Sequence, residues 1–306
     1  MSKIIFYGLL YFSKVDKNPN LGYINKNKKD KIFANNALNL AHSLKKQNLD
    51  FILITNNQKR LKDLVNYDYP VKKIKFKKVV NYNTDFFTAH FKIDVIKYLQ
   101  KKNQISCLLD LDILAINKIP TFLKTAARKK LNLVFDLNDR KDKNLNQKII
   151  NSLYKCNQLT NNYPNWYGGE FIFGDKIFFK YISKKIKMFY PNYLKNIDSV
   201  HHIGDEMLLN SALQSIKIEN KIKFYDVSGE KVIGRYWSIN TKKKLKKLDY
   251  YLKNFLIHLP SDKLFLSQLK VNELNYNEIK KMYKSKVFSL QNVYTNKLKK
   301  IIRKIL

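Results

Sequence analysis

The chain has 306 residues, of which 45% are hydrophobic, so it can bury the core of one large domain or of two small ones. Its net charge of +35 is typical of proteins that bind polyanions, but only five of its 59 basic residues are Arg, the usual reader of bases and phosphates. Its two cysteines, Cys107 and Cys156, exclude a disulfide framework and a four-cysteine zinc site and favour a reducing, cytoplasmic setting.

The N-terminal apolar stretch, residues 3–11, predicts a buried strand, because it lacks the long apolar segment and the cleavage site of a signal peptide. No later apolar run approaches the roughly 18–20 residues that a membrane-spanning helix needs. The other predicted strands are residues 50–55, 71–76, 106–116, 131–135, 169–173, 222–227 and 255–258. The predicted helices are residues 30–46, 84–101, 176–189 and 205–216. The first of them follows a predicted loop at residues 18–29 and has Asp30 as its cap. This alternation indicates an α/β fold with parallel strands, in which ligands bind outside the carboxyl ends of the strands.

From about residue 276 the pattern changes to a basic helical tail, so we divide the chain into residues 1–275 and residues 276–306. The last residues read TNKLKKIIRKIL and place one apolar stripe on a helix, with Lys and Arg on the rest of its surface. The stripe consists of Leu298, Ile301, Ile302, Ile305 and Leu306. Two interpretations stay open: residues 295–306 dock on the inner face of an anionic membrane, or the stripe packs on the preceding domain.

Two aspartates, Asp110 and Asp112, interrupt the apolar run SCLLDLDILAI at residues 106–116. Because an ionised carboxylate is costly to bury without a partner, we expect both to lie where the strand leaves the sheet, beside a positive charge. Residues two apart on an extended chain share one face, and two hard oxygen donors suit Mg²⁺ or Mn²⁺. The alternative is that one aspartate caps a turn and the other pairs with a surface Lys.

Four segments, in the same order along the chain, resemble the GT-A glycosyltransferases. They are AHFKIDVIKYLQKKNQISCLLDLDILAI, WYGGEFIFGD, GDEMLLNSAL and LIHLP, within a match over residues 3–265. The first is similar to the family's Lys-bearing helix and the strand that ends in Asp-x-Asp. The last is similar to the late His of the glycogenin-like and galactosyltransferase-like branch. The family's usual ending, H-x-x-G-x-x-K-P-W, is only HLPSDK here, without its Gly and its Trp.

The resemblance implies a Rossmann-like nucleotide-diphospho-sugar transferase fold, with a mixed, mostly parallel sheet flanked by helices. It implies transfer of a sugar from a nucleoside-diphosphate sugar, with a UDP-sugar favoured, to a saccharide or glycolipid acceptor. Mn²⁺ or Mg²⁺ held by Asp110 and Asp112, with Leu111 between them in the same site, would then stabilise the diphosphate leaving group. By resemblance, His258 is the third metal ligand and Lys92 contacts the nucleotide or diphosphate. The alternatives are a hydrogen-bonded structural histidine and one more lysine on a solvated helix face.

Further residues suggest roles in binding or catalysis. Asp205 and Glu206 begin a predicted helix, where a carboxylate can hold sugar hydroxyls or act as base on the acceptor hydroxyl. An acid at that position also simply favours the helix dipole. Gly168 and Gly169 let the backbone approach a sugar ring, or else form a tight turn into a strand. Lys263, after the last strand, is expected to steady the departing diphosphate.

The remaining predicted contacts follow strand ends. The predicted contacts with the nucleotide base are Tyr7 or Tyr11, Thr55 and Asn56. Asp136 and Asn138 follow the strand after the aspartate pair, and we expect them to face the donor sugar or the acceptor.

Two other functions stay open. A nucleotidyltransferase that makes the sugar nucleotide usually has a Gly-rich loop with Arg or Lys after its first strand, but this chain reads YGLLYFSKVDKNPN there. A basic nucleic-acid-binding protein without enzymatic activity would suit the charge. The chain lacks clusters of aromatic residues with Arg, so no specific nucleic-acid partner is expected.

Overall fold

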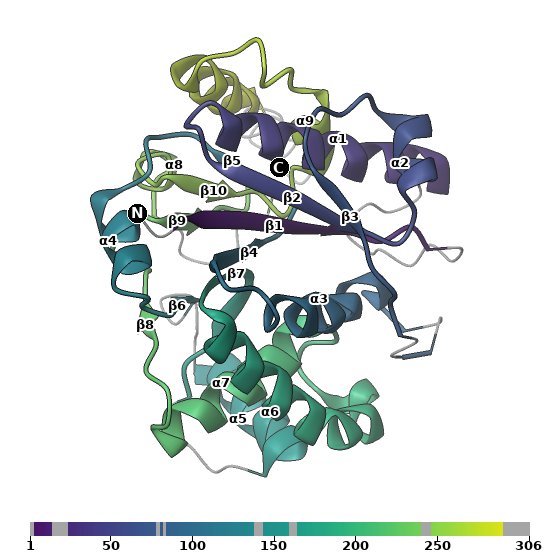
Figure 1. Cartoon of the computed structure of the whole chain (residues 1–306), viewed down its shortest axis with the longest axis vertical. Coiled ribbons are helices and arrows are strands. Elements are labelled where there is room, and N and C mark those ends of the chain that lie inside the picture. Colours follow the sequence, from purple (N-terminus) through teal and green to yellow (C-terminus); the bar gives the residue numbers. More distant parts are fainter. Residues whose placement is uncertain are drawn as a thin grey trace, which may run out of the picture.

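The computed structural model describes residues 3–13, 24–77, 80–81, 84–137, 143–158, 164–239 and 246–289. Over these ranges the chain builds a seven-stranded sheet with helices on both sides and a three-stranded sheet beside it (Figure 1). Helices α1 (Lys26–Lys45) and α2 (Gln58–Leu64) lie on one side of the large sheet, and α3 (Lys92–Leu99), α6 (Lys176–Lys195) and α7 (Asp205–Glu219) lie on the other. The predicted α/β fold class is therefore confirmed.

The large sheet has the strand order β3-β2-β1-β4-β7-β6-β8. Its strands are β1 (Ile4–Leu10), β2 (Asp50–Thr55), β3 (Val71–Lys73), β4 (Ile105–Leu109), β6 (Leu133–Asp136), β7 (Tyr167–Gly174) and β8 (Tyr225–Asp226). β1 pairs in parallel with β2 and β4, whereas β7 runs antiparallel to both of its neighbours, β4 and β6. The sheet is thus mixed and mostly parallel, as predicted.

The run predicted as one strand at residues 106–116 is two strands in two sheets. β4 ends at Leu109, and β5 (Ile113–Ala115) joins the small sheet with β10 (Leu256–His258) and β9 (Ile233–Arg235), in the order β5-β10-β9. β4 is buried between β1 and β7, so carboxylates could not continue it. Asp110 and Asp112 lie where the strand leaves the sheet, as expected, but in a turn, so the prediction that they share one face of an extended strand is wrong.

Two predicted helices also differ from expectation. α1 begins one residue after Asn25, whose side chain accepts a hydrogen bond from a backbone N–H of the first turn at 2.9 Å. Asp30, the predicted cap, lies inside the helix and pairs with the arginine of α2 at 3.1 Å. The helix predicted over residues 84–101 begins only after Phe86, whose left-handed φ of 52° cannot continue a helix, and it consists of a 3-10 helix, η2 (Phe87–Phe91), followed by α3. The other helices of the described chain are α4 (Thr121–Arg128), α5 (Lys143–Asn157), η4 (Ile197–Ser199), α8 (Leu248–Tyr251), α9 (Lys263–Gln268) and one over residues 276–289.

A second hydrophobic core, separate from that of the large sheet, joins the small sheet to the C-terminal helix. Its members include Leu114, Ile116, Tyr236, Ile257, Leu266, Ile279, Tyr283 and Val287. The last three come from the helix over residues 276–289, so this part of the predicted tail packs against the rest of the chain. Residues 290–306, which hold the predicted stripe, lie outside the described residues, and the division at residue 275 stays a prediction. No helix of the described part is long and apolar enough to cross a membrane.

Leu108 tests the position of β4, because its side chain is fully buried in the central strand. Leu108→Ala is expected to lower the free energy of unfolding by about 2–5 kcal/mol, through lost burial and the cavity left behind. Met188→Ala, on the exposed face of α6, is the control and should change it by less than about 0.5 kcal/mol. Urea unfolding followed by circular dichroism measures both, and equal effects would contradict the central place of β4.

Candidate active site

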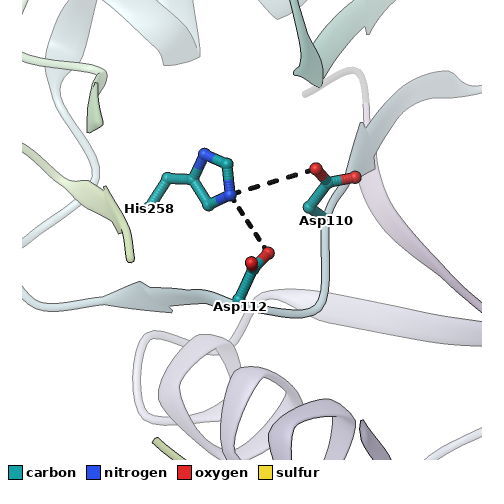
Figure 2. Close-up of side chains that lie close together, drawn as sticks. All are labelled: Asp110, Asp112 and His258. Atoms are coloured by element: carbon teal, nitrogen blue, oxygen red, sulfur yellow. Dashed lines mark hydrogen bonds and ion pairs between the residues drawn. The ribbon is translucent and has the colours of Figure 1, made fainter. Parts of the chain in front are cut away.

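Asp110, Asp112 and His258 meet at the junction of the two sheets, and Figure 2 shows the imidazole directed at both carboxylates. His258 Nε2 lies 3.1 Å from Asp112 Oδ1 and 3.9 Å from Asp110 Oδ2. The strand register explains this, because β10 runs antiparallel to β5 and pairs His258 with Ile113, next to Asp112. Asp112 and His258 are buried, and Asp110 is half-buried.

These three side chains have the donor set for a divalent cation. One donor atom from each lies within 4.8 Å of the others. Ligands that share an ion at about 2.1 Å lie about 3–4 Å apart, as the His258 distances do. Two carboxylates and one imidazole suit Mn²⁺ or Mg²⁺. Behind the ring, Glu170 Oε1 lies 3.2 Å from His258 Nδ1, an arrangement that orients metal-binding imidazoles.

The site attracts positive charge strongly. Burial alone would lower the pKa of His258, but the carboxylates of Asp112 and Glu170 outweigh it and raise the pKa to about 9. Burial would raise the pKa of Asp112, but Lys263 and His258 hold it well below its usual range. A metal ion bound at His258 would displace the ring proton.

Two lysines contact the aspartates. Lys92 Nζ, at the start of α3, lies 2.7 Å from Asp110 Oδ1 and 2.5 Å from Asp205 Oδ2. Lys263, the first residue of α9, donates to Asp112 Oδ2. Burial alone would lower the pKa of Lys92, but Asp110 and Asp205 raise it, so this lysine stays charged. Both lysines that were singled out in the sequence therefore lie in the site.

An arginine that the sequence reasoning missed adds to this group. Arg235 Nη1, at the end of β9, lies 3.7 Å from Glu170 Oε2 and 3.8 Å from Glu206 Oε2. Glu206 also accepts a hydrogen bond from the indole N–H of Trp166. Burial would raise the pKa of Glu170, but Arg235 and His258 lower it to about 2. A charged residue inside an apolar strand, the signal that marked the aspartate pair, also marks Glu170 in YGGEFIFG and Arg235 in VIGRYW.

A cavity of about 300 Å³ opens over these side chains, a size typical of small-molecule sites. The predicted site residues on its wall are Lys92, Asp110, Leu111, Asp112, Asp205, Glu206, His258 and Lys263. The first turns of α1 contribute Lys26, Lys29, Asp30 and Phe33, and aromatic side chains contribute Tyr11, Phe86, Phe87, His202 and Trp237. The cavity therefore joins a charged floor to a partly aromatic wall.

The side chains predicted to contact the nucleotide base are mostly elsewhere. Tyr7 is fully buried, and its hydroxyl accepts a hydrogen bond from Gln104 at 2.7 Å. Thr55 is also fully buried, and the Asn56 amide bonds to the backbone that follows β1 at 2.9 Å. Alternate residues of a strand face opposite sides of the sheet, so a place near a strand end does not decide which side chains reach a cavity. Of the two candidate tyrosines, Tyr11 lines the cavity.

The structure does not bring Asp136 to the cavity wall either. Asp136, at the end of β6, is buried and accepts a hydrogen bond from the side chain of Asn165. Asn138 lies outside the described residues, so its predicted contact with donor or acceptor stays a prediction.

Gly168 and Gly169 lie inside β7, and carboxylates occupy the space beside them. A Cβ on Gly168 would collide with the carboxylate of Glu170, which lies on the same face of the strand. A Cβ on Gly169 would come within 2.7 Å of Asp205 Oδ2. The structure thus gives a reason for the two glycines that the sequence did not reveal: they make room for two acids of the site.

No protein-family model and no curated protein matches the chain. Solved structures are similar to it over most of its length. The bifunctional glycosyltransferase WbbM, in its apo form, is 8% identical over 84% of this chain, with a TM-score of 0.49, and this chain spans only 45% of WbbM. The galactosyltransferase LgtC, in complex with donor and acceptor sugar analogs, is 10% identical over 86% of this chain and 95% of its own, with a TM-score of 0.48. An active-site mutant of LgtC is 11% identical over 83% of this chain and 86% of its own, with a TM-score of 0.46.

All three are glycosyltransferases. Because the identities are so low, the chemistry of this chain has to be argued from its own side chains.

Gly168→Ala tests the packing of Glu170. The new methyl group is expected to displace the buried carboxylate and to lower the free energy of unfolding by about 1–3 kcal/mol. Gly229→Ala is the matched control, because nothing lies within 4 Å of the added Cβ. It should leave the stability unchanged or raise it by up to about 1 kcal/mol. Denaturant unfolding measures both, and an unaffected Gly168→Ala protein would contradict the described position of Glu170.

Proposed function

We propose that the chain is a metal-dependent glycosyltransferase, which moves a sugar from a nucleoside-diphosphate sugar, a UDP-sugar in the first instance, to a saccharide or glycolipid acceptor. The observation that carries this proposal is the group Asp110, Asp112 and His258 on the cavity wall, with Lys92 and Lys263 beside it. The three side chains would hold Mn²⁺ or Mg²⁺. When bound, such an ion neutralises the charge that accumulates on the diphosphate leaving group.

The charge balance of the site supports a divalent ion as the companion of an anionic substrate. Five carboxylates belong to it, those of Asp110, Asp112, Glu170, Asp205 and Glu206. Four cations face them, namely Lys92, Arg235, Lys263 and the protonated His258. The protein's own cations do not outnumber the carboxylates even when Lys26, Lys29 and Asp30 of the cavity wall are added. A diphosphate therefore needs further positive charge beside the aspartates.

Glu206 is better placed than Asp205 to act on a sugar hydroxyl. Asp205 Oδ2 is held in an ion pair with Lys92 at 2.5 Å. Both residues line the cavity, but the Glu206 Oε2 lies 3.8 Å from Arg235, too far for a hydrogen bond. A carboxylate in this position can bind a sugar hydroxyl or accept its proton. We therefore assign the role of base or hydroxyl ligand to Glu206, with Asp205 holding Lys92 in place.

The aromatic wall suits a sugar ring. The rings of Phe86 and His202 stack with centroids 5.9 Å apart and planes at 23°. Both lie on the cavity wall beside Glu206, so a saccharide acceptor can place its apolar face on a flat surface and its hydroxyls near a carboxylate. LgtC is likewise bound to donor and acceptor sugar analogs.

Asp112→Asn tests the metal. The amide has no charge, so the rate of Mn²⁺-dependent hydrolysis of the donor is expected to fall more than about 100-fold. This loss is larger than the one expected when a residue that contacts only a ligand of the metal is removed. EDTA should have the same effect on the unaltered chain. Released nucleotide measures hydrolysis, and the donor is chosen by a thermal-shift screen of UDP-, GDP-, CMP- and dTDP-sugars with and without Mn²⁺.

Asp249→Asn is the matched control, because Asp249 is an exposed acid that pairs with Lys284 on the surface. It should hydrolyse the donor at the unaltered rate. Full hydrolysis in EDTA, or by the Asp112→Asn protein, would contradict the metal mechanism.

We also propose that the C-terminal segment contacts an anionic membrane peripherally, on its cytoplasmic face. The helix over residues 276–289 precedes the basic tail in the sequence and exposes Met282 by 42%, next to Lys281 in the sequence, and Phe288 by 65%. Apolar side chains among lysines are typical of helices that lie on membrane surfaces. Each Lys near anionic lipid adds about 1 kcal/mol of attraction.

Removal of residues 292–306 tests this contact. The shortened chain is expected to float less with vesicles rich in phosphatidylserine than the 306-residue chain does, because it loses the apolar stripe and its flanking charges. Phosphatidylcholine vesicles are the control and should bind neither protein. Equal flotation of the two proteins on the anionic vesicles would remove the proposal.

A further inference from the structure

Asp262 is a buried carboxylate in the loop between His258 and Lys263, with an exposed fraction of 2%. The Ser238 hydroxyl donates to its Oδ1 at 2.7 Å, and the Tyr283 hydroxyl donates to its Oδ2 at 2.7 Å. Lys286 forms an ion pair with its Oδ1. A carboxylate with so little access to water needs such partners, and we call these four residues the Asp262 anchor.

The same loop is tied to the aspartate pair at its other side. The backbone N–H of Leu259 donates to the carbonyl of Asp112 at 2.9 Å. His258 Nε2 lies 3.1 Å from one oxygen of the Asp112 carboxylate, and Lys263 donates to the other. Residues 258–263 are therefore tied to Asp112 on one side and to Ser238, Tyr283 and Lys286 on the other.

Two members of the anchor come from the helix over residues 276–289, which packs in the second hydrophobic core. The Tyr283 ring is buried in the second hydrophobic core, 6.1 Å from the Tyr236 ring and 5.6 Å from the Phe265 ring. Burial and the charge of Asp262 raise the pKa of Tyr283, so its hydroxyl remains a donor. Well-packed donors of this kind fix the orientation of the carboxylate that they bind.

We propose that Tyr283 and Lys286 are positioning residues for the nucleoside-diphosphate site: through Asp262 they hold the loop of residues 258–263 so that His258 and Lys263 face Asp112. This inference rests on the proposed function. It makes the helix over residues 276–289 part of the active-site scaffold. Neither residue lines the cavity, so both act through the loop and not on the substrate.

Three variants of the 306-residue chain test the anchor. Tyr283→Phe removes one hydroxyl, Lys286→Met removes the charge, and Lys286→Arg keeps it. Lys284→Met is the matched control, since Lys284 lies on the same helix and pairs with the exposed Asp249 at 2.5 Å. Calorimetric titration with Mn²⁺ and UDP, or the diphosphate of the best donor in the thermal-shift screen, gives the Kd of each protein below its melting temperature.

Tyr283→Phe and Lys286→Met are expected to raise the Kd about tenfold, as loss of an outer-shell partner does. Lys286→Arg should restore most of the affinity, and Lys284→Met should bind like the unaltered chain. The KM for the donor should rise while the KM for the acceptor stays constant. A purely structural role would lower the folded fraction and leave the Kd of that fraction unchanged.

The outcomes separate the two proposals. If the unaltered chain binds no nucleoside diphosphate with Mn²⁺, the proposed function fails and the anchor's role fails with it. If it binds, and folded Tyr283→Phe and Lys286→Met proteins bind as tightly as Lys284→Met, the positioning role is overturned while the proposed function stands. If Lys286→Met does not fold, Tyr283→Phe decides alone, because it removes a single hydroxyl.

Discussion

The Asp112 carboxylate has to be neutralised at a place with little access to water, since its side chain is 7% exposed. An ion buried there without a partner would cost several kcal/mol. His258, at the end of β10, and Lys263, at the start of α9, supply the compensation. Neither could reach Asp112 unless β5 left the large sheet and paired with β10. The small sheet and the core beside it are thus arranged around one buried charge.

The compensation continues away from Asp112 as a series of alternating charges. His258 forms an ion pair with Glu170, Glu170 with Arg235, and Arg235 with Glu206 at the start of α7. Each member is buried enough that loss of its partner leaves a charge without compensation. Because the members share partners, substitutions along the series are coupled and their effects are not additive. The series connects the aspartate pair to the helix that carries the proposed base.

Much of the α/β architecture could be predicted, because strands such as β1, β2 and β4 are apolar runs bounded by polar residues and α7 begins with two acids. The break within residues 106–116 could not, since a local pattern cannot distinguish one long strand from two short ones joined by a turn. The choice between Tyr7 and Tyr11 was also out of reach. The two residues are four apart and would share a face of an extended strand, but Tyr7 is buried inside β1 whereas Tyr11 lies beyond the end of the strand. Where β1 ends is a property of the packed sheet.

Residue order alone was enough to place a carboxylate pair at a strand end, because an aspartate inside an apolar run has few stable alternatives. It also pointed to Lys92, His258 and Lys263 through resemblance. Packing determined how these residues meet, and it added Arg235 and the Asp262 anchor. Asp112 and His258 are 146 residues apart in the sequence, and they come together only through the pairing of β5 with β10. No local pattern records such a register, because it depends on how distant segments bury their apolar faces against one another.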